Sequence, residues 1–587
     1  MCGIWAFIEL TKNTADMVKL YQDFMQLKPR GPDMSSFQTI KNLTVGFHRL
    51  AIMDPTFHAN QPYILEDGDR TIIFVCNGEI YNFKDLIREH NLPIHNNSDC
   101  MTIPQLYLKY VKHNPDGQNL MHDFVELFKY DIKGEFAFLL FEFDKFQNLK
   151  QITSCRDQIG IRPMYYHHPT SETKNLMFSS EIKAMCSFED KVKEFEPGTI
   201  LEINFDSFGS IASTNTYNFQ TVYNVIPYDL SKDLVLTSND TQAKKVHLQE
   251  LEDNFLRNVR ESVVNAVKRR LQADCTIGYL LSGGLDSSLT ASISAKFSDK
   301  PINTFCCGLV GTDSTDIKYA RLAAEHIGSR HTEVMFTIEE ALGMIETVVK
   351  TIESHCITSI RASIPQFLVS KYVSTMTEIK VLITGEASDE VASGYLFNYY
   401  APDGNAIHET AKEYVKRVHM YDGRRCDRCI SGVSCEARIP LADPDFIEKY
   451  FTIPGEWRHP NYKNCEKWWL RKAFDGLDVV QRDVLWRKKE AFSDGISGTT
   501  KSWFQILRDH IETLVSDEEF AQNKWNSNTK EEYYYKKLFV KHFGEKRLDI
   551  ITGNWQPKWN SSGQVITGYV DPSARTLSVY KKEDQEK

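Results

Sequence analysis

The second residue of the chain is a cysteine, and this position gives it a chemistry of its own. If Met1 is removed, Cys2 carries both a thiol and a free α-amino group. An amine with its unperturbed pKa of about 7.7–8.0 can act as the general base for the thiol of the same residue. Taken alone, a cysteine at position 2 is more often a small buried residue than a nucleophile. A catalytic interpretation therefore needs further residues of the same site.

Such residues follow Cys2 in order along the first hundred positions. They are Arg30-Gly31-Pro32-Asp33, His48-Arg49-Leu50-Ala51-Ile52, Asn77-Gly78-Glu79-Ile80-Tyr81-Asn82 and Ser98-Asp99. With Cys2 at the start, this series resembles the class II glutamine amidotransferase domain, an N-terminal nucleophile hydrolase. One of these motifs alone would mean little, whereas the ordered set is highly specific.

The resemblance implies a role for each polar residue in hydrolysing the side-chain amide of glutamine. Amide hydrolysis passes through a tetrahedral oxyanion, which the side-chain amide of Asn77 and the backbone N–H of Gly78 would stabilise. An arginine is suited to the α-carboxylate of glutamine, and carboxylates are suited to its α-ammonium group. The glutamine-binding residues implied in this way are Arg49, Ile52, Glu79 and Asp99. Without the resemblance, we would interpret Arg49 as part of a surface ion pair and Asp99 as a turn residue.

A second series of motifs begins with Leu281-Ser282-Gly283-Gly284-Leu285-Asp286-Ser287-Ser288, between an apolar strand and a helical stretch. Its glycines let backbone N–H groups approach phosphate oxygens, and a helix N-terminus adds favourable partial charge. Asp286 is suited to hold Mg²⁺, which prefers carboxylate and phosphate oxygens. The stretch has no Walker A Gly-Lys-Ser/Thr, which favours cleavage of ATP to AMP and pyrophosphate. It resembles the pyrophosphate-binding loop of the ATP pyrophosphatases, and an ordinary Gly-rich turn is the alternative.

Three later segments extend the resemblance to the asparagine synthetases. They are Thr358–Ser363, Gly385–Glu390 and Trp486–Gly495. The resemblance implies that Glu386 acts in ammonia handling and that Asp389 helps to place aspartate or metal. It also implies that Lys489 stabilises the departing pyrophosphate as a point cation. The ATP-binding residues implied are Leu281, Ser282, Gly283, Gly284, Asp286, Ser287, Cys307, Arg361, Thr384 and Gly385.

Some residues of the second half leave questions open. Ala387 and Ser393 stand where the family usually has glycine, and an added Cβ matters only where φ is positive or the backbone approaches a ligand. The sequence therefore leaves catalytic efficiency open. Cys426, Cys429 and Cys435 have a spacing that suggests zinc, but no fourth ligand lies nearby at standard spacing, and Cys465 is not excluded. We interpret these cysteines as thiols without a metal.

Two large domains must position these residues, because single cores stop growing near about 250–300 residues and the chain has 587. The apolar opening MCGIWAFIEL reads as a buried strand. Short β-branched and aromatic runs predict further antiparallel strands at Leu43–Ala51, Arg70–Cys76, Glu135–Phe143 and Lys150–Ser154. With the resemblance, they indicate an αββα N-terminal-nucleophile hydrolase sandwich over residues 2–206. Residues 207–245 are polar and weakly periodic, and we predict a linker there.

The pattern changes after this stretch. Apolar residues recur every fourth position from Leu251 to Leu271, which predicts a helix. The strands Thr276–Leu281, Asn303–Gly308 and Val381–Thr384 alternate with helical stretches such as Ser287–Phe297. This alternation predicts a doubly wound parallel α/β domain over residues 246–578, followed by a solvated tail at 579–587.

Composition narrows the classes of partner. The chain has 69 basic and 79 acidic residues, a formal charge of -10, which argues against a nucleic-acid or anionic-membrane surface. It has no run of about 18 apolar residues. Thirteen cysteines without an export signal predict reduced thiols and a cytoplasmic enzyme. A homodimer is left open.

The predicted activity is the ATP-driven amidation of aspartate to asparagine, with glutamine as the nitrogen donor. The resemblance implies a glutamyl thioester on Cys2, channelled ammonia and a β-aspartyl-AMP intermediate, with ATP and Mg²⁺ required. One alternative is a related amide-forming ligase that acts on another carboxylate. A degenerate regulator with the same fold is a second alternative, which the intact Cys2, Arg49, Asn77, Asp286, Arg361, Glu386 and Lys489 argue against.

Overall fold

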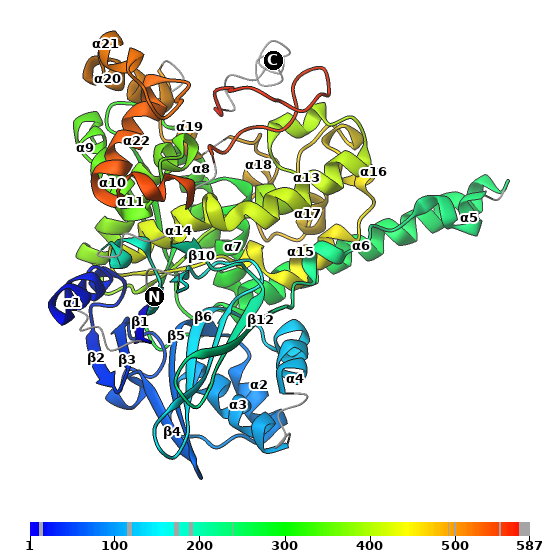
Figure 1. The fold of residues 1–587 in the computed structure, drawn as a ribbon. Helices are drawn as coiled ribbons and strands as arrows, with labels where there is room; N and C mark the ends of the chain where they lie inside the picture. Colours follow the sequence, from blue (N-terminus) through cyan, green and yellow to red (C-terminus); the bar gives the residue numbers. More distant parts are fainter. Residues whose placement is uncertain are drawn as a thin grey trace.

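The protein is described by a computed structural model that covers residues 1–10, 16–113, 120–169, 175–186, 192–237, 239–490, 492–497, 501–550 and 553–573. The predicted tail at 579–587 lies outside these residues. Two domains lie against each other, with the strand-rich first domain below the second in Figure 1 and the N-terminus at their junction. No helix in the described part combines the length and the apolar character needed to cross a membrane.

Two six-stranded antiparallel sheets form the first domain. Their strand orders are β10-β8-β9-β1-β3-β2 and β12-β11-β7-β6-β5-β4. The strands are β1 (Gly3–Glu9), β2 (Met34–Ile40), β3 (Leu43–Arg49), β4 (Tyr63–Asp67), β5 (Arg70–Ile80), β6 (Gly134–Phe143), β7 (Leu149–Arg156), β8 (Tyr165–His167), β9 (Asn175–Ser179), β10 (Lys193–Glu194), β11 (Thr199–Phe205) and β12 (Ile211–Asn218). Each strand predicted from the first half of the sequence corresponds to one of them.

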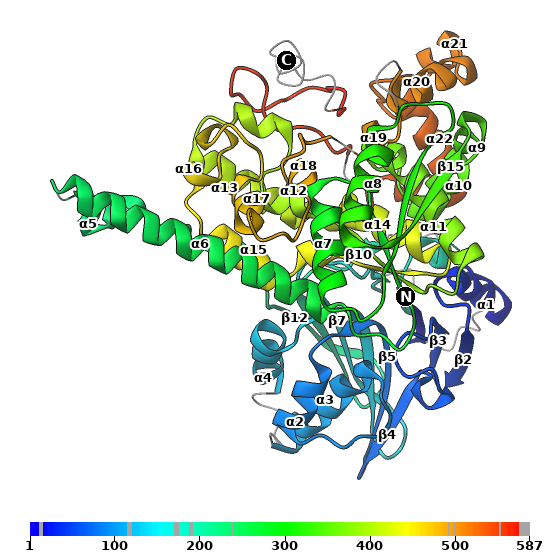
Figure 2. The same cartoon turned by 180° about the vertical axis from the view of Figure 1, so that it is seen from behind.

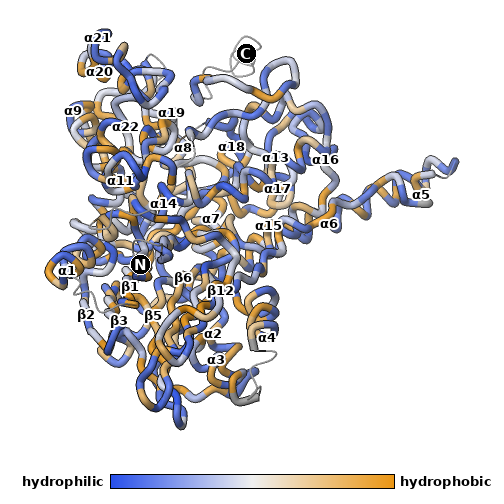
Figure 3. The backbone as a smooth tube through the Cα atoms, viewed as in Figure 1, coloured by the Kyte–Doolittle hydropathy of each residue, from blue (hydrophilic) through white to orange (hydrophobic). Residues whose placement is uncertain are grey.

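Apolar side chains hold the layers of this domain together. Residues such as Ile4, Val45 and Leu139 fill the space between the two sheets, where Figure 3 shows hydrophobic strands. On the outer face of the first sheet, α1 (Met17–Met25) packs through Phe24 against Trp5. The outer face of the second sheet is covered by α2 (Phe83–His90), α3 (Thr102–His113) and α4 (Leu120–Glu126). The predicted αββα sandwich is confirmed.

The stretch 207–245 differs from the predicted linker. Residues 211–218 form β12, which pairs with β11 at the edge of the second sheet. Most side chains of β12 are exposed, so its Ser, Thr and Asn residues gave no hydrophobic alternation to recognise. The short helix α5 (Leu234–Thr237) and the long helix α6 (Thr241–Arg269) follow. The first half of α6 projects from the body of the molecule (Figure 1 and Figure 2).

A five-stranded parallel sheet forms the centre of the second domain. Its order is β15-β14-β13-β16-β17. The strands are β13 (Ile277–Leu280), β14 (Asn303–Leu309), β15 (Arg330–Phe336), β16 (Val381–Ile383) and β17 (Glu436–Arg438). The chain runs outward from β13 to β15 and then returns to the other side of β13, which confirms the doubly wound prediction. The direction reverses between β13 and β16, and open α/β sheets bind ligands at such a switch point.

Helices pack around this sheet. They are α7 (Leu285–Lys296), α8 (Thr315–Ile327), α9 (Ile338–Leu342), α10 (Ile345–Ile352), α11 (Ile357–Met376), α12 (Ser388–Val391), α13 (Gly404–Arg417), α14 (Asp422–Ser431), α15 (Pro444–Phe451), α16 (Gly455–Arg458), α17 (Trp468–Phe474), α18 (Arg482–Leu485), α19 (Phe492–Gly495), α20 (Trp503–Leu514), α21 (Asp517–Ala521) and α22 (Lys530–Phe543). The predicted helix 251–271 corresponds to α6, which buries Phe255, Val259, Val263 and Val267 against this domain.

Candidate active sites

Cys2 lies directly before β1 and faces Asn77 of β5, because these two strands belong to the facing sheets of the first domain. The backbone N–H of Cys2 donates to Oδ1 of Asn77 at 3.0 Å. The amide nitrogen Nδ2 of Asn77 is buried and has no hydrogen-bond partner among the residues that the structure describes. An unpaired buried donor costs free energy, so this atom calls for an acceptor from a ligand. With Gly78 next to it in β5, the arrangement fits the predicted pair of oxyanion donors.

The thiol of Cys2 is not activated while Met1 is present. Burial raises the pKa of the Cys2 thiol to about 11, so only about one thiol in ten thousand is ionised at neutral pH. The amino group of Met1 is itself buried, 3.7 Å from a carboxylate oxygen of Glu436. Burial lowers the pKa of this amino group. Removal of Met1 would place a base on Cys2 itself.

Glu79 and Asp99 are two neighbouring buried carboxyl groups, and the charge of Glu79 acts on the thiol of Cys2. Burial, together with the charge of Glu436, raises the pKa of Glu79 well above its ordinary value. Burial also raises the pKa of Asp99 to about 6, although its Oδ2 accepts a hydrogen bond from the N–H of Ile80 at 2.6 Å. The positive charge near these two carboxyl groups does not offset the effect of burial on their pKa values. An ammonium group from a ligand would stabilise their ionised forms, which fits the predicted role.

Arg49 and Ile52 have other contacts in this structure. Nη1 of Arg49 donates to the carbonyl of Thr56 at 2.7 Å and to Oδ1 of Asn60 at 2.6 Å. Its Nη2 donates to carbonyls of the same loop. A glutamine carboxylate would therefore share or replace these oxygens. Ile52 is buried against Val381 of the second domain, so it ties this loop to β16.

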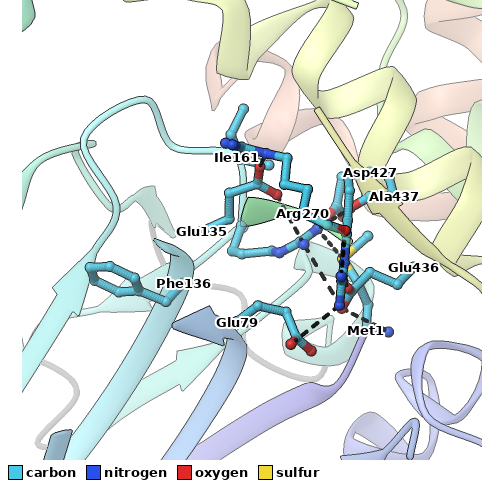
Figure 4. A network of polar contacts seen from close by, with 12 residues as sticks. Met1, Glu79, Glu135, Phe136, Ile161, Arg270, Asp427, Glu436 and Ala437 are labelled. Atoms are coloured by element: carbon cyan, nitrogen blue, oxygen red, sulfur yellow. Dashed lines mark hydrogen bonds and ion pairs between the residues drawn. The ribbon is translucent and has the colours of Figure 1, made fainter. Parts of the chain in front are cut away.

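Buried ion pairs join the two domains beside the glutamine-site residues (Figure 4). Nη2 of Arg438, in β17, lies 3.3 Å from Oε2 of Glu79. Nε of Arg270, at the end of α6, donates to Oε1 of Glu135 at 2.8 Å. Arg30 of the first domain lies 2.8 Å from Asp427 of α14. The first site is therefore held from both domains.

A second candidate site lies at the switch point of the parallel sheet. A cleft opens there at the carboxyl ends of β13 and β16. The predicted site residues that line it are Leu281, Ser282, Gly284, Asp286, Ser287, Cys307, Thr384, Gly385, Glu386, Asp389 and Lys489. The structure thus brings together residues that are more than two hundred positions apart in the sequence.

The loop after β13 leaves backbone donors at this cleft. Gly284 is the N-cap of α7, and no side chain caps the first turn, so its N–H groups are available to an anion. Gly283 does not line the cleft, but its φ is +68° and a Cβ there would lie 2.3 Å from the backbone nitrogen of Ala320. A Cβ on Gly385 would lie 2.5 Å from the nitrogen of Ser287. The loop after β16 is therefore in direct backbone contact with the first turn of α7.

Two carboxylates and two lysines form the charged centre of the cleft. Nζ of Lys467 lies 2.6 Å from Asp286 and 2.6 Å from Asp389. Nζ of Lys489 lies 2.6 Å from the other oxygen of Asp389. Although burial opposes it, these ammonium groups hold the pKa of Asp389 below its ordinary value. The ammonium group of Lys467 lies between these two carboxylates, whose oxygens are of the kind that Mg²⁺ takes as ligands.

Comparison with known proteins gives a family match for each of the two domains. Residues 1–232 match the glutamine amidotransferase domain family, and residues 258–411 and 403–566 match the asparagine synthase family. The chain belongs to the asparagine synthase family. A protein from Gallus gallus named asparagine synthetase [glutamine-hydrolyzing] is 34% identical over 610 residues, which span 100% of both chains. Proteins of the same name from Mus musculus and Homo sapiens are each 33% identical over 602 residues, 99% of both chains.

Lys467 is a cleft residue of this asparagine synthase family member that the sequence analysis missed. It precedes α17 with a φ of +54° and is almost fully buried. The short sequence around it, Asn464-Cys465-Glu466-Lys467, carries no recognisable spacing. A lysine directly before an apolar helix was the one available signal, and it is too common to be specific.

Arg361 is placed differently from its prediction. It does not line the cleft. Its guanidinium donates to both carboxylate oxygens of Glu531 in α22, at 2.9 and 2.6 Å, and to Asp571 at 3.0 and 3.1 Å. Two carboxylates thus neutralise it and tie α11 to the C-terminal segment. Arg487 does line the cleft, where Nη1 donates to the carbonyl of Ser282 at 3.2 Å.

The two departures from glycine fall at positions that favour glycine. The φ angle is +70° at Ala387 and +53° at Ser393. Both residues are buried, and the hydroxyl of Ser393 has no hydrogen-bond partner in the described structure. Each residue is therefore held in a left-handed backbone conformation that costs free energy for any residue with a Cβ.

The thiols of Cys426, Cys429 and Cys435 point to three different partners. These are the hydroxyl of Thr384, the carbonyl of Ser363 and the carbonyl of Ile379. Within the described residues, no group of three or more His, Cys, Asp or Glu could hold a metal ion. The interpretation of these cysteines as thiols without a metal stays a prediction.

Proposed function

We propose that this chain makes asparagine from aspartate, with glutamine as the nitrogen donor and with cleavage of ATP to AMP and pyrophosphate. One observation carries the proposal: the same chain contains two candidate sites. In the first, Cys2 lies beside the buried amide donor of Asn77, and the second is a cleft at the switch point of the parallel sheet, with a Gly-rich loop suited to phosphate. Membership of the asparagine synthase family and relatives that align over their full length support the same reaction.

In the first domain, the thiolate of Cys2 attacks the side-chain carbonyl carbon of glutamine. Asn77 and Gly78 stabilise the oxyanion, and the α-amine of Cys2 takes the thiol proton and delivers it to the leaving nitrogen. Ammonia leaves, and water then hydrolyses the glutamyl thioester to glutamate. Glu79 and Asp99 bind the α-ammonium group of glutamine. Arg49 binds its α-carboxylate, which replaces some of the loop oxygens that Arg49 contacts in this structure. The raised pKa of Asp99 fits this task, because an incoming cation stabilises the ionised form.

In the second domain, a β-carboxylate oxygen of aspartate attacks the α-phosphorus of ATP. The bond to the oxygen that bridges the α- and β-phosphates breaks, and pyrophosphate leaves. The N–H groups at the start of α7 and the ammonium groups of Lys467 and Lys489 neutralise the charge that develops there. Asp286 and Asp389 would hold Mg²⁺, which supplies further charge neutralisation to the phosphates.

Ammonia then has to pass from the first site to the second. Free ammonia is mostly protonated at neutral pH and would be lost to water, so an enclosed route between the domains is part of the proposal. The buried contacts of Glu79 and Glu135 with Arg438 and Arg270 support it, since they keep the domains closely apposed beside the first site.

The test is a steady-state assay with glutamine, ATP, Mg²⁺ and a panel of carboxylic acids, in which glutamate, AMP and the amide product are measured. We expect aspartate to be converted and asparagine, AMP and glutamate to form in equal amounts. Efficient conversion of another acid in preference to aspartate would support the alternative ligase. No AMP formation with any acid would reject both.

We also propose a cellular location and an oligomeric state. All 13 cysteines are free thiols, which supports a reducing, cytoplasmic location. A homodimer stays a prediction, and light scattering on the purified protein tests it.

A further inference from the structure

An arginine that the proposed mechanism does not use donates hydrogen bonds to both oxygens of the Glu386 carboxylate. Nη1 of Arg425 donates to Oε1 of Glu386 at 3.0 Å, and Nη2 donates to Oε2 at 2.7 Å. Glu386 lines the cleft, whereas Arg425 belongs to α14 and is almost fully buried. The planar guanidinium therefore fixes both the position and the plane of the carboxylate.

Arg425 is in turn held from two sides. Oδ1 of Asp422 accepts from its Nε at 3.2 Å and from its Nη2 at 3.0 Å. The side-chain oxygen of Gln366, in α11, accepts from Nη1 at 2.9 Å. The hydroxyl of Tyr395 donates to Oδ2 of Asp422 at 3.1 Å and to Oε1 of Glu390 at 2.8 Å, which connects Arg425 through Asp422 to the loop before η8 (Leu396–Tyr400). The orientation of Glu386 is thus built from several elements.

Charge matters here as much as position. The groups that face Glu386 are Arg425, Asp422, Cys426 and Cys429 of α14, together with Lys489. Burial, and then the charge of Asp422, raise the pKa of Glu386, while Arg425 and Lys489 oppose the rise. Loss of the guanidinium would leave Lys489 as the one facing cation among these groups, so the carboxyl would bind a proton at higher pH.

The proposed reaction contains a step that needs such a carboxylate. Ammonia attacks the acyl carbon of the adenylate, a C–N bond forms, and the C–O bond to AMP breaks. The nitrogen becomes positively charged during the attack and must release one proton to a base. We propose that Arg425 is a positioning residue for this step, which keeps Glu386 ionised and aimed into the cleft so that it takes that proton. This inference rests on the proposed function.

The test separates adenylate formation from attack by ammonia. Adenylate formation is followed by aspartate-dependent exchange of pyrophosphate into ATP, and the second step by asparagine formation from ammonium salts between pH 6 and 9. We expect Arg425→Lys and Arg425→Met to retain exchange within about threefold. Asparagine formation should fall at least tenfold, mainly in kcat, and its acidic limb should move to higher pH, further for Arg425→Met.

The chain offers a matched control on the same helix. Arg424 is also buried and also pairs with a carboxylate, Glu194, but it faces away from the cleft. Arg424→Lys should leave both steps and the pH profile unchanged. Retained exchange also shows that the Arg425 variants are folded, because the cleft must be intact for it.

Glu386→Gln separates failure of this inference from failure of the proposed function. Loss of ammonia attack in Glu386→Gln, with unchanged kcat and pH profile in both Arg425 variants, would overturn the positioning role and leave the proposed function standing. Equal loss of exchange and of asparagine formation in the Arg425 variants would assign Arg425 a merely structural role. Full activity of Glu386→Gln would remove Glu386 from the mechanism, and the inference with it.

Discussion

Replacing Ser393 by glycine is expected to stabilise the second domain, because two separate costs disappear together. A residue with a Cβ in the left-handed region costs about 1–2 kcal/mol, and the φ of Ser393 is +53°. Its hydroxyl is buried and unpaired, and such a group costs about 1–3 kcal/mol. Glycine loses about 0.5–1 kcal/mol through the greater freedom of the unfolded chain. The net gain is about 1–4.5 kcal/mol.

Two further substitutions separate these contributions. Ser393→Ala removes the hydroxyl and keeps the strained backbone, so it should give only the polar part of the gain. Ala387→Gly relieves the φ of +70° at a buried position without a polar atom. It should therefore stabilise by no more than about 1.5 kcal/mol after the same loss to chain freedom.

Calorimetry and urea unfolding of the four proteins measure these differences. If the whole chain of 587 residues unfolds in one transition, 1 kcal/mol shifts Tm by about 0.8 °C, so Ser393→Gly should raise Tm by about 1–4 °C. The order expected is Ser393→Gly above Ser393→Ala, with both above the parent. A Ser393→Gly protein no more stable than Ser393→Ala would refute the claim that backbone strain is stored at this position.

Three other predictions concern the two sites. The mature, active chain should begin at Cys2, as checked by intact mass, and Cys2→Ala should lose glutamine-dependent synthesis while keeping ammonia-dependent synthesis; retention of Met1 on fully active protein would contradict this. Lys489→Ala should lower pyrophosphate release about a hundred- to thousand-fold without affecting glutaminase activity, and Lys489→Arg should recover part of it; a loss below about tenfold would remove Lys489 from the catalytic residues. Because the pKa of Asp99 is raised to about 6, glutaminase kcat/KM should fall as the pH drops through 6; an Asp99→Asn protein that still shows the same fall would show that another group, such as Glu79, titrates there.

The sequence predicted those parts of the fold whose signals are local. Strands such as β5 and β6 are buried on both faces, and their apolar runs are continuous. The loop before α7 was recognisable because glycines, an aspartate and serines occur together between a strand and a helix. β12 escaped because an edge strand with exposed polar side chains lacks alternation.

Two residues at or next to the cleft were not predicted, for a different reason. Lys467 reaches Asp286 from a position 181 residues later in the chain, and Arg425 reaches Glu386 from a separate helix. Such pairs exist only after the sheet has brought its loops together, so spacing within one segment says nothing about them. Arg361 is a related case: this cation in a matching segment pairs with Glu531 and Asp571 of later elements, and its contact with ATP stays a prediction.

The ion pairs between the domains have a consequence for how the molecule comes apart. Arg30, Arg162 and Arg270 are fully buried, and each pairs with a carboxylate across or beside the domain boundary. Separating the domains would break the pairs that cross the boundary and would also expose the apolar cluster that extends from Trp5 of the first domain to Ile430 of the second, which costs free energy. The two halves are therefore coupled in a single cooperative unit. Heat or denaturant should melt them in one transition, although sheet topology alone would suggest two independent bodies.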